Sequence, residues 1–295
     1  MAKIGRFKSD QARETYEAAY AALAASWPLP ATELDIPTSF GSTHVRRSGS
    51  GSGTPIVLLP SFGGNGLYWD FIVEDLARDR IVYAPDTIGV AGKSVQTAPI
   101  VGEADFATWF NEVMAGLGVG DVHLLGLSQG AWHASLVALH GPERLASVTL
   151  IEPNGIITKM RWTVLAKILR FGMNPTDEKW RKMTAWLTPG VTMSDAEFAC
   201  ARAALGYQTG LGWSRVLDDV ELRSIATPLL AIFGGESVVC DPEAAVRRIA
   251  DRVPNADTEI YPGMGHGVLD QIPEQVVPRV LHFLRQHDRL AAPAE

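Results

Sequence analysis

Short apolar runs recur along the chain and alternate with longer segments that have helical character. The apolar runs occupy residues 56–59, 81–84, 122–125, 147–151, 229–233 and 258–261. Helical spacing, or a composition that favours helix, marks residues 9–27, 69–77, 104–117, 131–140, 242–250 and 276–286. Short apolar runs bounded by polar segments are typical of buried strands. Strands that alternate with helices predict an α/β protein with a doubly wound, mostly parallel sheet.

Two further segments near the N-terminus, residues 32–40 and 44–47, predict a hairpin of two strands. Pro37 lies within the first of them. Proline has no N–H to donate to a neighbouring strand, and it is therefore confined to edge strands and bulges. We expect residues 32–40 to form an edge of the sheet.

The alternation of strands and helices stops between residues 155 and 225. Several helical patterns occupy this stretch, and it contains no convincing strand pattern. A helical stretch between two sheet strands predicts a cap inserted into the fold. The predicted division is therefore an α/β core made of residues 1–154 and 226–295, with a helical cap or lid at residues 155–225.

Composition and charge narrow the class of protein. The 295 residues are 46% hydrophobic and 20% charged, which is ordinary for a globular protein. The net charge of −7 disfavours a nucleic-acid partner, and two cysteines do not imply a disulfide framework. The N-terminal residues show no signal-peptide core, and no run of about eighteen apolar residues predicts a membrane span. We therefore expect a soluble, cytoplasmic protein.

A Gly-x-Ser-x-Gly sequence centred on Ser128 separates the apolar run at 122–125 from the helical segment at 131–140. A strand, a tight turn and a helix in this order form the context in which a nucleophilic serine is held on a strained turn. Gly126 and Gly130 leave room for close approach of the backbone. The context favours a catalytic serine over a serine that merely lies in a glycine-flanked turn.

Four motifs resemble those of the α/β-hydrolase superfamily, in the same order, and the resemblance spans nearly the whole chain. They are Leu-Leu-Pro-Ser-Phe-Gly-Gly at 58–64, Asp-Thr-Ile-Gly-Val-Ala-Gly-Lys-Ser at 86–94, the turn at Ser128, and Gly-Met-Gly-His-Gly at 263–267. The first motif departs from the superfamily's His-Gly-x-Gly pattern, because Pro60 and Ser61 replace His-Gly. The N-terminal helix and hairpin are similar to a carboxylesterase-like branch with a serine nucleophile. The resemblance implies the α/β-hydrolase fold with an inserted helical cap.

The resemblance also implies a catalytic triad whose base is His266, in the glycine-rich loop after the last strand. The superfamily usually carries the acid in a Gly-x-x-Asp turn after the penultimate strand, but Ser237 occupies that position here. Glu152 follows the preceding strand, where some α/β-hydrolases carry their acid. Asp241 lies four residues beyond the usual position, and Glu236 lies one residue before it. Glu152 is favoured, and Asp241 and Glu236 stay open as alternatives.

A serine nucleophile decides the class of reaction. Serine forms an acyl intermediate, whereas the aspartate of dehalogenases and epoxide hydrolases of this fold forms an alkyl ester. We therefore expect cleavage of an ester or thioester through an acyl-enzyme on Ser128, which is the reaction of a carboxylesterase (EC 3.1.1). The oxyanion hole should consist of the backbone N–H groups of Phe62 and Gln129. No metal or cofactor is needed, and the sequence has neither a His-Glu-x-x-His motif nor a cysteine–histidine cluster.

Two alternative functions use the same sequence features. An acyltransferase or cyclase of a biosynthetic pathway would use the same triad with an alcohol or amine in place of water. A non-catalytic ligand-binding protein would keep the fold without the chemistry. Hydrolysis and acyl transfer differ only in access of water, which the sequence does not determine.

The predicted cap is rich in large apolar side chains, of which Trp162 and Trp186 are candidates for lining the substrate pocket. We expect an apolar small-molecule substrate on this ground. Residues 159–182 also carry seven Lys and Arg against two carboxylates. A solvated helix face explains such a charge. A basic face in an acidic chain would equally suit an acidic carrier protein that delivers a thioester.

Overall fold

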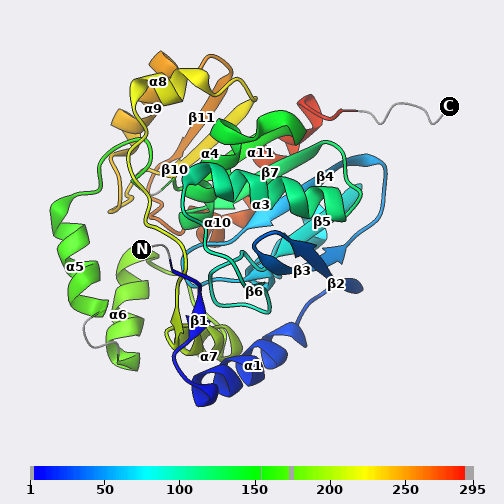
Figure 1. Ribbon diagram of the computed structural model, residues 1–295. Helices are drawn as coiled ribbons and strands as arrows, with labels where there is room; N and C mark the ends of the chain where they lie inside the picture. The colour runs from blue at the N-terminus through cyan, green and yellow to red at the C-terminus, as the bar shows by residue number, and fades with distance from the viewer. Residues whose placement is uncertain (1–2, 154, 173–175, 290–295) are drawn as a thin grey trace.

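The computed structural model describes residues 3–153, 155–172 and 176–289, so residue 154 at the predicted core boundary lies outside the described residues. Its main sheet has the strand order β11-β10-β8-β7-β4-β5-β3-β2, with β6 paired to β3 (Figure 1). The strands are β1 (Arg6–Phe7), β2 (Ala31–Thr38), β3 (Gly41–Ser48), β4 (Gly53–Leu59), β5 (Arg80–Pro85), β6 (Val95–Gln96), β7 (Val122–Leu127), β8 (Leu145–Ile151), β9 (Tyr207–Gln208), β10 (Leu229–Gly234) and β11 (Ala256–Tyr261).

In the sheet, each pair of neighbours from β11 through β10, β8, β7 and β4 to β5 is parallel. The pairs that β3 makes with β2, β5 and β6 are antiparallel. The predicted mostly parallel sheet is therefore confirmed. All residues of β7 are buried, because helices cover both faces of the sheet, and this explains its continuous apolar run. The strand that contains Pro37 forms an edge of the sheet, as predicted.

Helices cover the sheet on both faces. Trp109 of α3, Val137 of α4 and Ile249 of α9 belong to the hydrophobic core on one face. Val73 of α2 and Leu281 of α11 belong to the core on the other face, so the fold is doubly wound as predicted. The helices are α1 (Asp10–Ala24), η1 (Gly66–Trp69), α2 (Val73–Leu76), α3 (Glu103–Gly116), α4 (Gln129–His140), η2 (Pro142–Arg144), α5 (Trp162–Gly172), α6 (Asp177–Leu187), α7 (Asp195–Ala204), α8 (Asp219–Ser224), α9 (Pro242–Arg252), α10 (Val268–Gln271) and α11 (Pro273–Gln286).

The helix predicted over residues 69–77 is instead the 3-10 helix η1 followed by the short α2. The side chain of Asn65 accepts from the Leu67 N–H and starts the helical turn early. Trp69 and Ile72 are both buried in the core of this face of the sheet. Tertiary packing therefore interrupts a helix that local propensity alone would favour.

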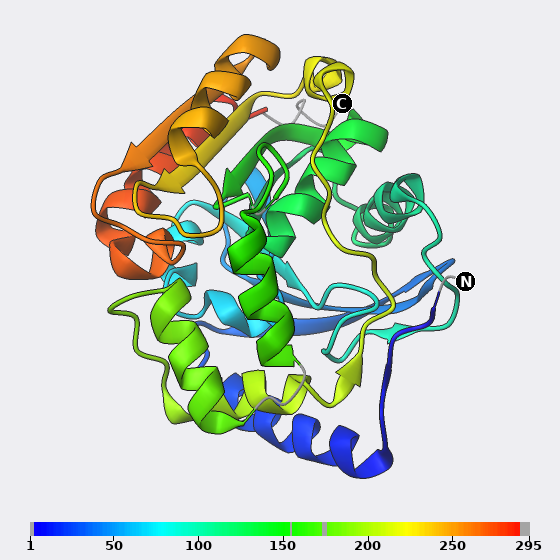
Figure 2. The same ribbon diagram turned by 90° about the vertical axis from the view of Figure 1, so that its left-hand side faces the viewer.

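Between β8 and β10 the chain forms α5, α6, α7 and α8, and Figure 2 shows α5 in the foreground with α6 beside it. This stretch also contains β9, which the sequence did not predict. β9 pairs antiparallel with β1 through Phe7 and Tyr207, and α7 packs against α1. A two-residue strand has no alternating pattern of its own, and it forms here because the N-terminal chain supplies its partner.

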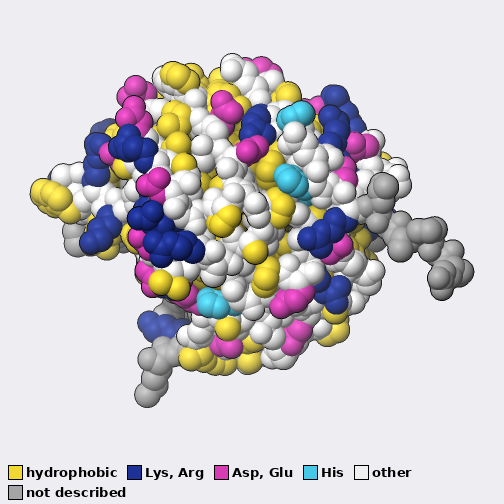
Figure 3. Space-filling model, turned by 90° about the horizontal axis from the view of Figure 1, so that it is seen from above, with side chains coloured by type: hydrophobic (Ala, Val, Ile, Leu, Met, Phe, Trp, Pro, Cys, Tyr) yellow, Lys and Arg dark blue, Asp and Glu magenta, His cyan; other side chains and the backbone are white. Residues whose placement is uncertain are grey.

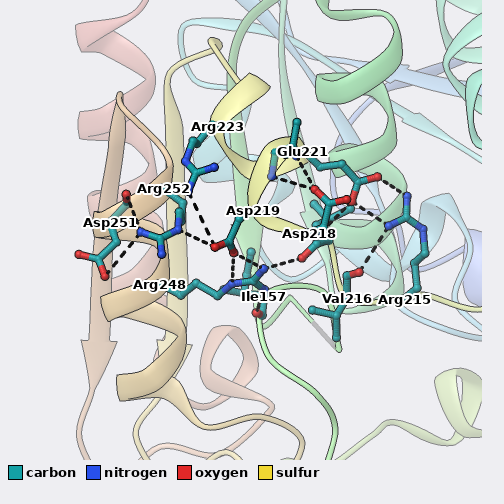
Figure 4. A network of polar contacts seen from close by, with 12 residues as sticks. Ile157, Arg215, Val216, Asp218, Asp219, Glu221, Arg223, Arg248, Asp251 and Arg252 are labelled. Carbon is teal, nitrogen blue, oxygen red and sulfur yellow. Dashed lines mark hydrogen bonds and ion pairs between the residues drawn. The ribbon is translucent and has the colours of Figure 1, made fainter.

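Arg248 of α9 joins both ends of this inserted stretch to the core. Its guanidinium donates to the carbonyl oxygens of Ile157 and Leu217 and to the carboxylate of Asp219 (Figure 4). The N–H of Leu217 also donates to the oxygen of Ile156 at 2.9 Å. The segment that leaves the core and the segment that returns to it therefore lie next to each other, and Arg248 hydrogen-bonds to both.

Candidate active site

Ser128 lies in the turn between β7 and α4 and has a strained backbone. Its φ of 53° is in the left-handed region, which costs a non-glycine residue about 1–3 kcal/mol. A Cβ atom on Gly126 would lie 2.2 Å from the Gly130 oxygen, and one on Gly130 would lie 2.0 Å from the Leu59 oxygen. Both glycines are therefore required for the turn to fit between β4 and α4. The strain is maintained by the packing around it, as in other functional turns.

Glu152 directly follows β8 and shares this left-handed backbone, with a φ of 49°. Its N–H donates to the Ile232 oxygen at 2.8 Å, which continues the sheet by one residue. The side chain is buried, and its carboxylate accepts from the Gly234 N–H at 2.5 Å and from the Ser237 hydroxyl at 2.7 Å. Burial of a carboxylate is costly unless hydrogen bonds replace its water. These donors compensate for the burial and orient the carboxylate.

His266, in the loop after β11, connects the carboxylate to the serine. Its Nδ1 lies 2.7 Å from Glu152 Oε2, and its Nε2 lies 3.0 Å from Ser128 Oγ. When Nδ1–H donates to the carboxylate, Nε2 carries the lone pair and accepts from the hydroxyl. A Cβ atom on Gly234 would lie 2.1 Å from the Gly265 oxygen, so glycine at position 234 lets the histidine loop approach β10.

The structure leaves the two alternative carboxylates away from the histidine. Asp241 Oδ1 accepts from the Ala244 N–H at 3.0 Å and caps α9. The Glu236 side chain is exposed, and its backbone N–H donates to a carbonyl oxygen of the histidine loop at 2.8 Å. Ser237 occupies the position usual for the acid and donates to Glu152 instead. The unusual serine in that position was the signal that could have revealed this contact.

The two residues predicted to form the oxyanion hole are Gln129, which directly follows the serine, and Phe62. Gln129 is the first residue of α4, where N–H groups have no acceptor inside the helix. Phe62 follows β4 and lines the same cavity as Ser128. Its side chain is about half exposed and stacks on Trp213, with ring centroids 5.5 Å apart. The oxyanion role of these two amides stays a prediction, which the helix start at Gln129 favours.

A cavity of about 490 Å³ has Ser128 and His266 in its wall. Residues of α6 and α7 form part of the same wall, so the inserted stretch helps to enclose the serine. A second cavity, of about 230 Å³, shares Phe62 and Trp180 with the first. The size of the first cavity suits a small organic molecule.

Trp162 and Trp186 line neither cavity, which corrects the prediction for these two side chains. Trp162 is 77% exposed, and the ring of Trp186 packs under the Lys167 ammonium, 3.5 Å from the ring centroid. Trp180 lines both cavities instead. It shares α6 with Trp186, but six residues are not a whole number of helical turns, so the two rings leave the helix in different directions.

The described residues contain neither a candidate metal site nor a helix that could span a membrane. In the part of the chain that the structure describes, no group of three or more His, Cys, Asp and Glu side chains could hold a metal ion. None of the described helices is both long enough and apolar enough to cross a membrane. Cys200 and Cys240 are buried free thiols.

The α/β-hydrolase class of protein is defined by a mostly parallel sheet that carries a serine on a strand–turn–helix elbow. A histidine and a carboxylate follow neighbouring strand ends. The sequence profile of the alpha/beta hydrolase family matches residues 56–279, which is most of the chain. The chain therefore belongs to this family, as its four motifs predicted.

The chain is similar to several esterases. It is 28% identical over 278 residues to the uncharacterized carboxylesterase nap of Bacillus subtilis (strain 168). This alignment covers 87% of this chain and 88% of that protein. It is also 28% identical over 255 residues to the pimeloyl-(acyl-carrier protein) methyl ester esterase of Aeromonas hydrophila. That alignment covers 79% of this chain and 96% of the esterase. The crystal structure of carboxylesterase CesB (YbfK) from Bacillus subtilis matches with a TM-score of 0.86 and 27% identity, over 93% of this chain and 98% of that one. These similarities confirm the carboxylesterase-like branch.

Proposed function

We propose that this protein is a serine carboxylesterase that hydrolyses an ester of a small apolar molecule. The observation that carries the proposal is the continuous line of contacts from Glu152 through His266 to Ser128. The carboxylesterases among its relatives support the same reaction. A thioester is a second possible substrate, since its acyl carbon is attacked in the same way.

In the first half-reaction, Ser128 Oγ attacks the carbonyl carbon of the ester while its proton passes to His266 Nε2. Glu152 accepts from Nδ1–H and stabilises the imidazolium that forms. The electron pair of the carbonyl bond moves to oxygen, and the N–H groups of Phe62 and Gln129 stabilise this oxyanion. When the intermediate collapses, the alcohol leaves with the proton from His266, and the acyl group stays on Ser128.

Water then attacks the acyl-enzyme by the same route and releases the acid. An acyltransferase or cyclase would admit an alcohol or amine at this stage. The esterase names of the relatives favour water. Product analysis with an added alcohol tests the choice, because formation of a new ester at the expense of the free acid would favour transfer. A non-catalytic binding protein would have no use for the three aligned side chains.

We also propose that residues 155–225 act as a cap over the serine, with residues 1–154 and 226–295 as the core. The support is that Trp180 of α6 and Cys200 of α7 line the cavity that contains Ser128. Leu205, Leu211 and Trp213 line the adjoining cavity, which favours an apolar group on the substrate.

An acidic carrier protein at the basic residues 159–182 stays a prediction. Its support is the Aeromonas relative, whose name gives an ester on a carrier protein as its substrate. Part of the basic charge is already engaged, because Lys167 lies over Trp186 and Lys182 pairs with Glu178 at 2.5 Å. The cytoplasmic location likewise stays a prediction.

The proposed reaction is tested with a short-chain p-nitrophenyl ester and a serine-directed phosphonate. We expect turnover of the ester and one covalent adduct on the peptide that contains Ser128. Ser128→Ala should lose both signals. Ser135→Ala is the matched control, because it removes another hydroxyl of α4 that only binds the Ala131 oxygen, and it should retain both. An adduct on a different residue, or turnover by Ser128→Ala, would contradict the proposal.

A further inference from the structure

Helix α5 presents large apolar side chains to solvent. Trp162, Leu165 and Leu169 are 77%, 50% and 61% exposed. Successive residues turn by about 100° around a helix, so these three positions lie within about 60° of one another. Val164, on the opposite side, is the buried residue of this helix. The three side chains therefore form one outward apolar stripe.

The apolar stripe lies within a basic part of an acidic chain. Residues 159–182 carry seven Lys and Arg against two carboxylates, whereas the net charge of the chain is −7. Lys159, Arg161 and Arg170 are exposed close to the stripe in sequence. Figure 3 shows hydrophobic side chains protruding at the left-hand edge, where α5 lies in Figure 1, with Lys and Arg side chains near them. The same helix is in the foreground of Figure 2.

The combination of an apolar stripe and surrounding cations selects among the surfaces that could cover α5. A second copy of this chain is disfavoured, because the two basic faces would repel each other. A protruding helix with Trp and Leu along one side and Lys and Arg around them has the composition of helices that lie in the plane of a lipid interface. Anionic headgroups would attract the cations while the stripe leaves water.

We propose that α5 docks this protein on an anionic lipid surface, with the apolar stripe at the boundary between headgroups and acyl chains. Docking needs neither the serine nor the histidine, so the inference stands apart from the proposed catalysis. For an ester hydrolase it has a clear use, because apolar esters concentrate at such interfaces. Docking through α5 would bring the inserted stretch to its substrate.

The proposal is tested by co-sedimentation of the full chain with vesicles. We expect binding to phosphatidylcholine vesicles that contain phosphatidylglycerol, at least about tenfold tighter than to phosphatidylcholine alone, and weakened by added salt. The triple variant Trp162→Ala, Leu165→Ala and Leu169→Ala should bind these vesicles about tenfold or more weakly, and alanine preserves the helix. The matched control is Val101→Ala with Val220→Ala, which truncates side chains that are 75% and 71% exposed elsewhere and should leave binding unchanged.

Turnover of a water-soluble ester without vesicles checks that the triple variant is folded, and it should match the wild type. Ser128→Ala should bind vesicles as the wild type does, which separates failure of docking from failure of catalysis. Equal binding to anionic and neutral vesicles, or unchanged binding by the triple variant, would overturn the proposal. Self-association that the triple variant abolishes would assign the stripe to a second copy. Capture of an acidic carrier protein that depends on the cations alone would assign the face to that partner.

Discussion

Glu152 holds His266 Nδ1 at 2.7 Å, although the two residues lie 114 positions apart in the chain. The contact depends on the neighbouring positions of β7, β8 and β10 in the sheet. Ser128 N–H donates to the last residue of β8, and Glu152 N–H donates to Ile232 of β10. The strand ends are therefore joined by backbone hydrogen bonds, and the side chains that follow them meet at one edge.

Replacing the carboxylate of Glu152 tests its proposed role. We expect Glu152→Gln to lower kcat by about 10²–10⁴-fold, because the amide does not stabilise an imidazolium and favours the wrong tautomer of His266. Asp241→Asn should leave kcat nearly unchanged and lower the free energy of unfolding by less than about 1 kcal/mol, since asparagine also caps a helix and only the interaction of the charge with the N-terminus of α9 is lost. Steady-state kinetics and urea unfolding measure both effects, and the reverse order would assign the acid to Asp241.

Ser237 tests whether the second donor to the carboxylate matters. Its hydroxyl donates to Glu152 Oε2, the oxygen that also contacts His266. Removing a hydrogen bond to a charged group costs about 1.5–3 kcal/mol, so Ser237→Ala should lower kcat by about tenfold or more with little change in KM. Ser237→Thr keeps the hydroxyl and should retain most of the activity. Equal losses in both variants would point to packing in place of the hydrogen bond.

Gly130 tests the steric requirement of the turn. A Cβ atom there would lie 2.0 Å from the Leu59 oxygen, so Gly130→Ala forces β4 and α4 apart. We expect a loss of about 3 kcal/mol in the free energy of unfolding, together with loss of turnover. Gly120→Ala is the control, because a Cβ atom there meets nothing within 4 Å. Thermal unfolding of the two variants beside the wild type measures the difference, and similar melting temperatures would refute the steric account.

His133 makes stability depend on pH. It is buried on α4 with its ring stacked on Phe106, and burial lowers the pKa of His133 from 6.5 to about 3. Between these values the unfolded chain binds the proton and the folded chain does not, so the unfolded state gains stability as the pH falls. His133 therefore does not lower the free energy of unfolding well above pH 6.5. Its destabilising contribution grows as the pH falls from 6.5 toward 3.

The size of this destabilisation can be measured by comparison with a variant that has an uncharged side chain at position 133. Between pH 7 and pH 4.5 we expect His133 to contribute about 2–3 kcal/mol of destabilisation. His133→Gln should therefore lose less stability over this interval than the wild type by about that amount. His123, whose pKa burial lowers to about 4, is present in both proteins and cancels in the comparison. Urea unfolding at the two pH values measures the difference, and parallel losses would exclude His133 as the source.

Arg248 is predicted to hold the two ends of the inserted stretch. It donates to the oxygens of Ile157 and Leu217, so Arg248→Ala leaves both carbonyls without this donor. We expect a loss of about 1–3 kcal/mol in stability and faster hydrogen exchange in residues 155–160 and 214–219. The neighbouring Arg247→Ala removes an exposed arginine that pairs only with Glu243 at 3.4 Å, and it should change neither quantity. Unchanged exchange in Arg248→Ala would contradict the role.

The six parallel strands, the hairpin of β2 and β3, the longer helices of the core and the serine turn could be predicted because their causes are local. Apolar runs indicated the buried strands, and glycines two residues to either side of Ser128 indicated a tight turn. The 3-10 turn before α2 and the two-residue strands β1, β6 and β9 were not predicted, because each depends on packing partners far along the chain. The same limit applied to the candidate site, where three carboxylates remained open for one position.

The sequence by itself determined that a serine would stand on a strand–turn–helix elbow and that a glycine-rich histidine loop would follow the last strand. Sterics and apolar spacing within a few residues are sufficient for both. Only the tertiary structure decided that Glu152 faces His266, that Ser237 donates to that carboxylate, and that Trp180 lines the cavities in place of Trp162 and Trp186. These outcomes depend on which strands are neighbours and on how each helix is rotated against the core, and both are set by the packing of residues that lie far apart in the chain.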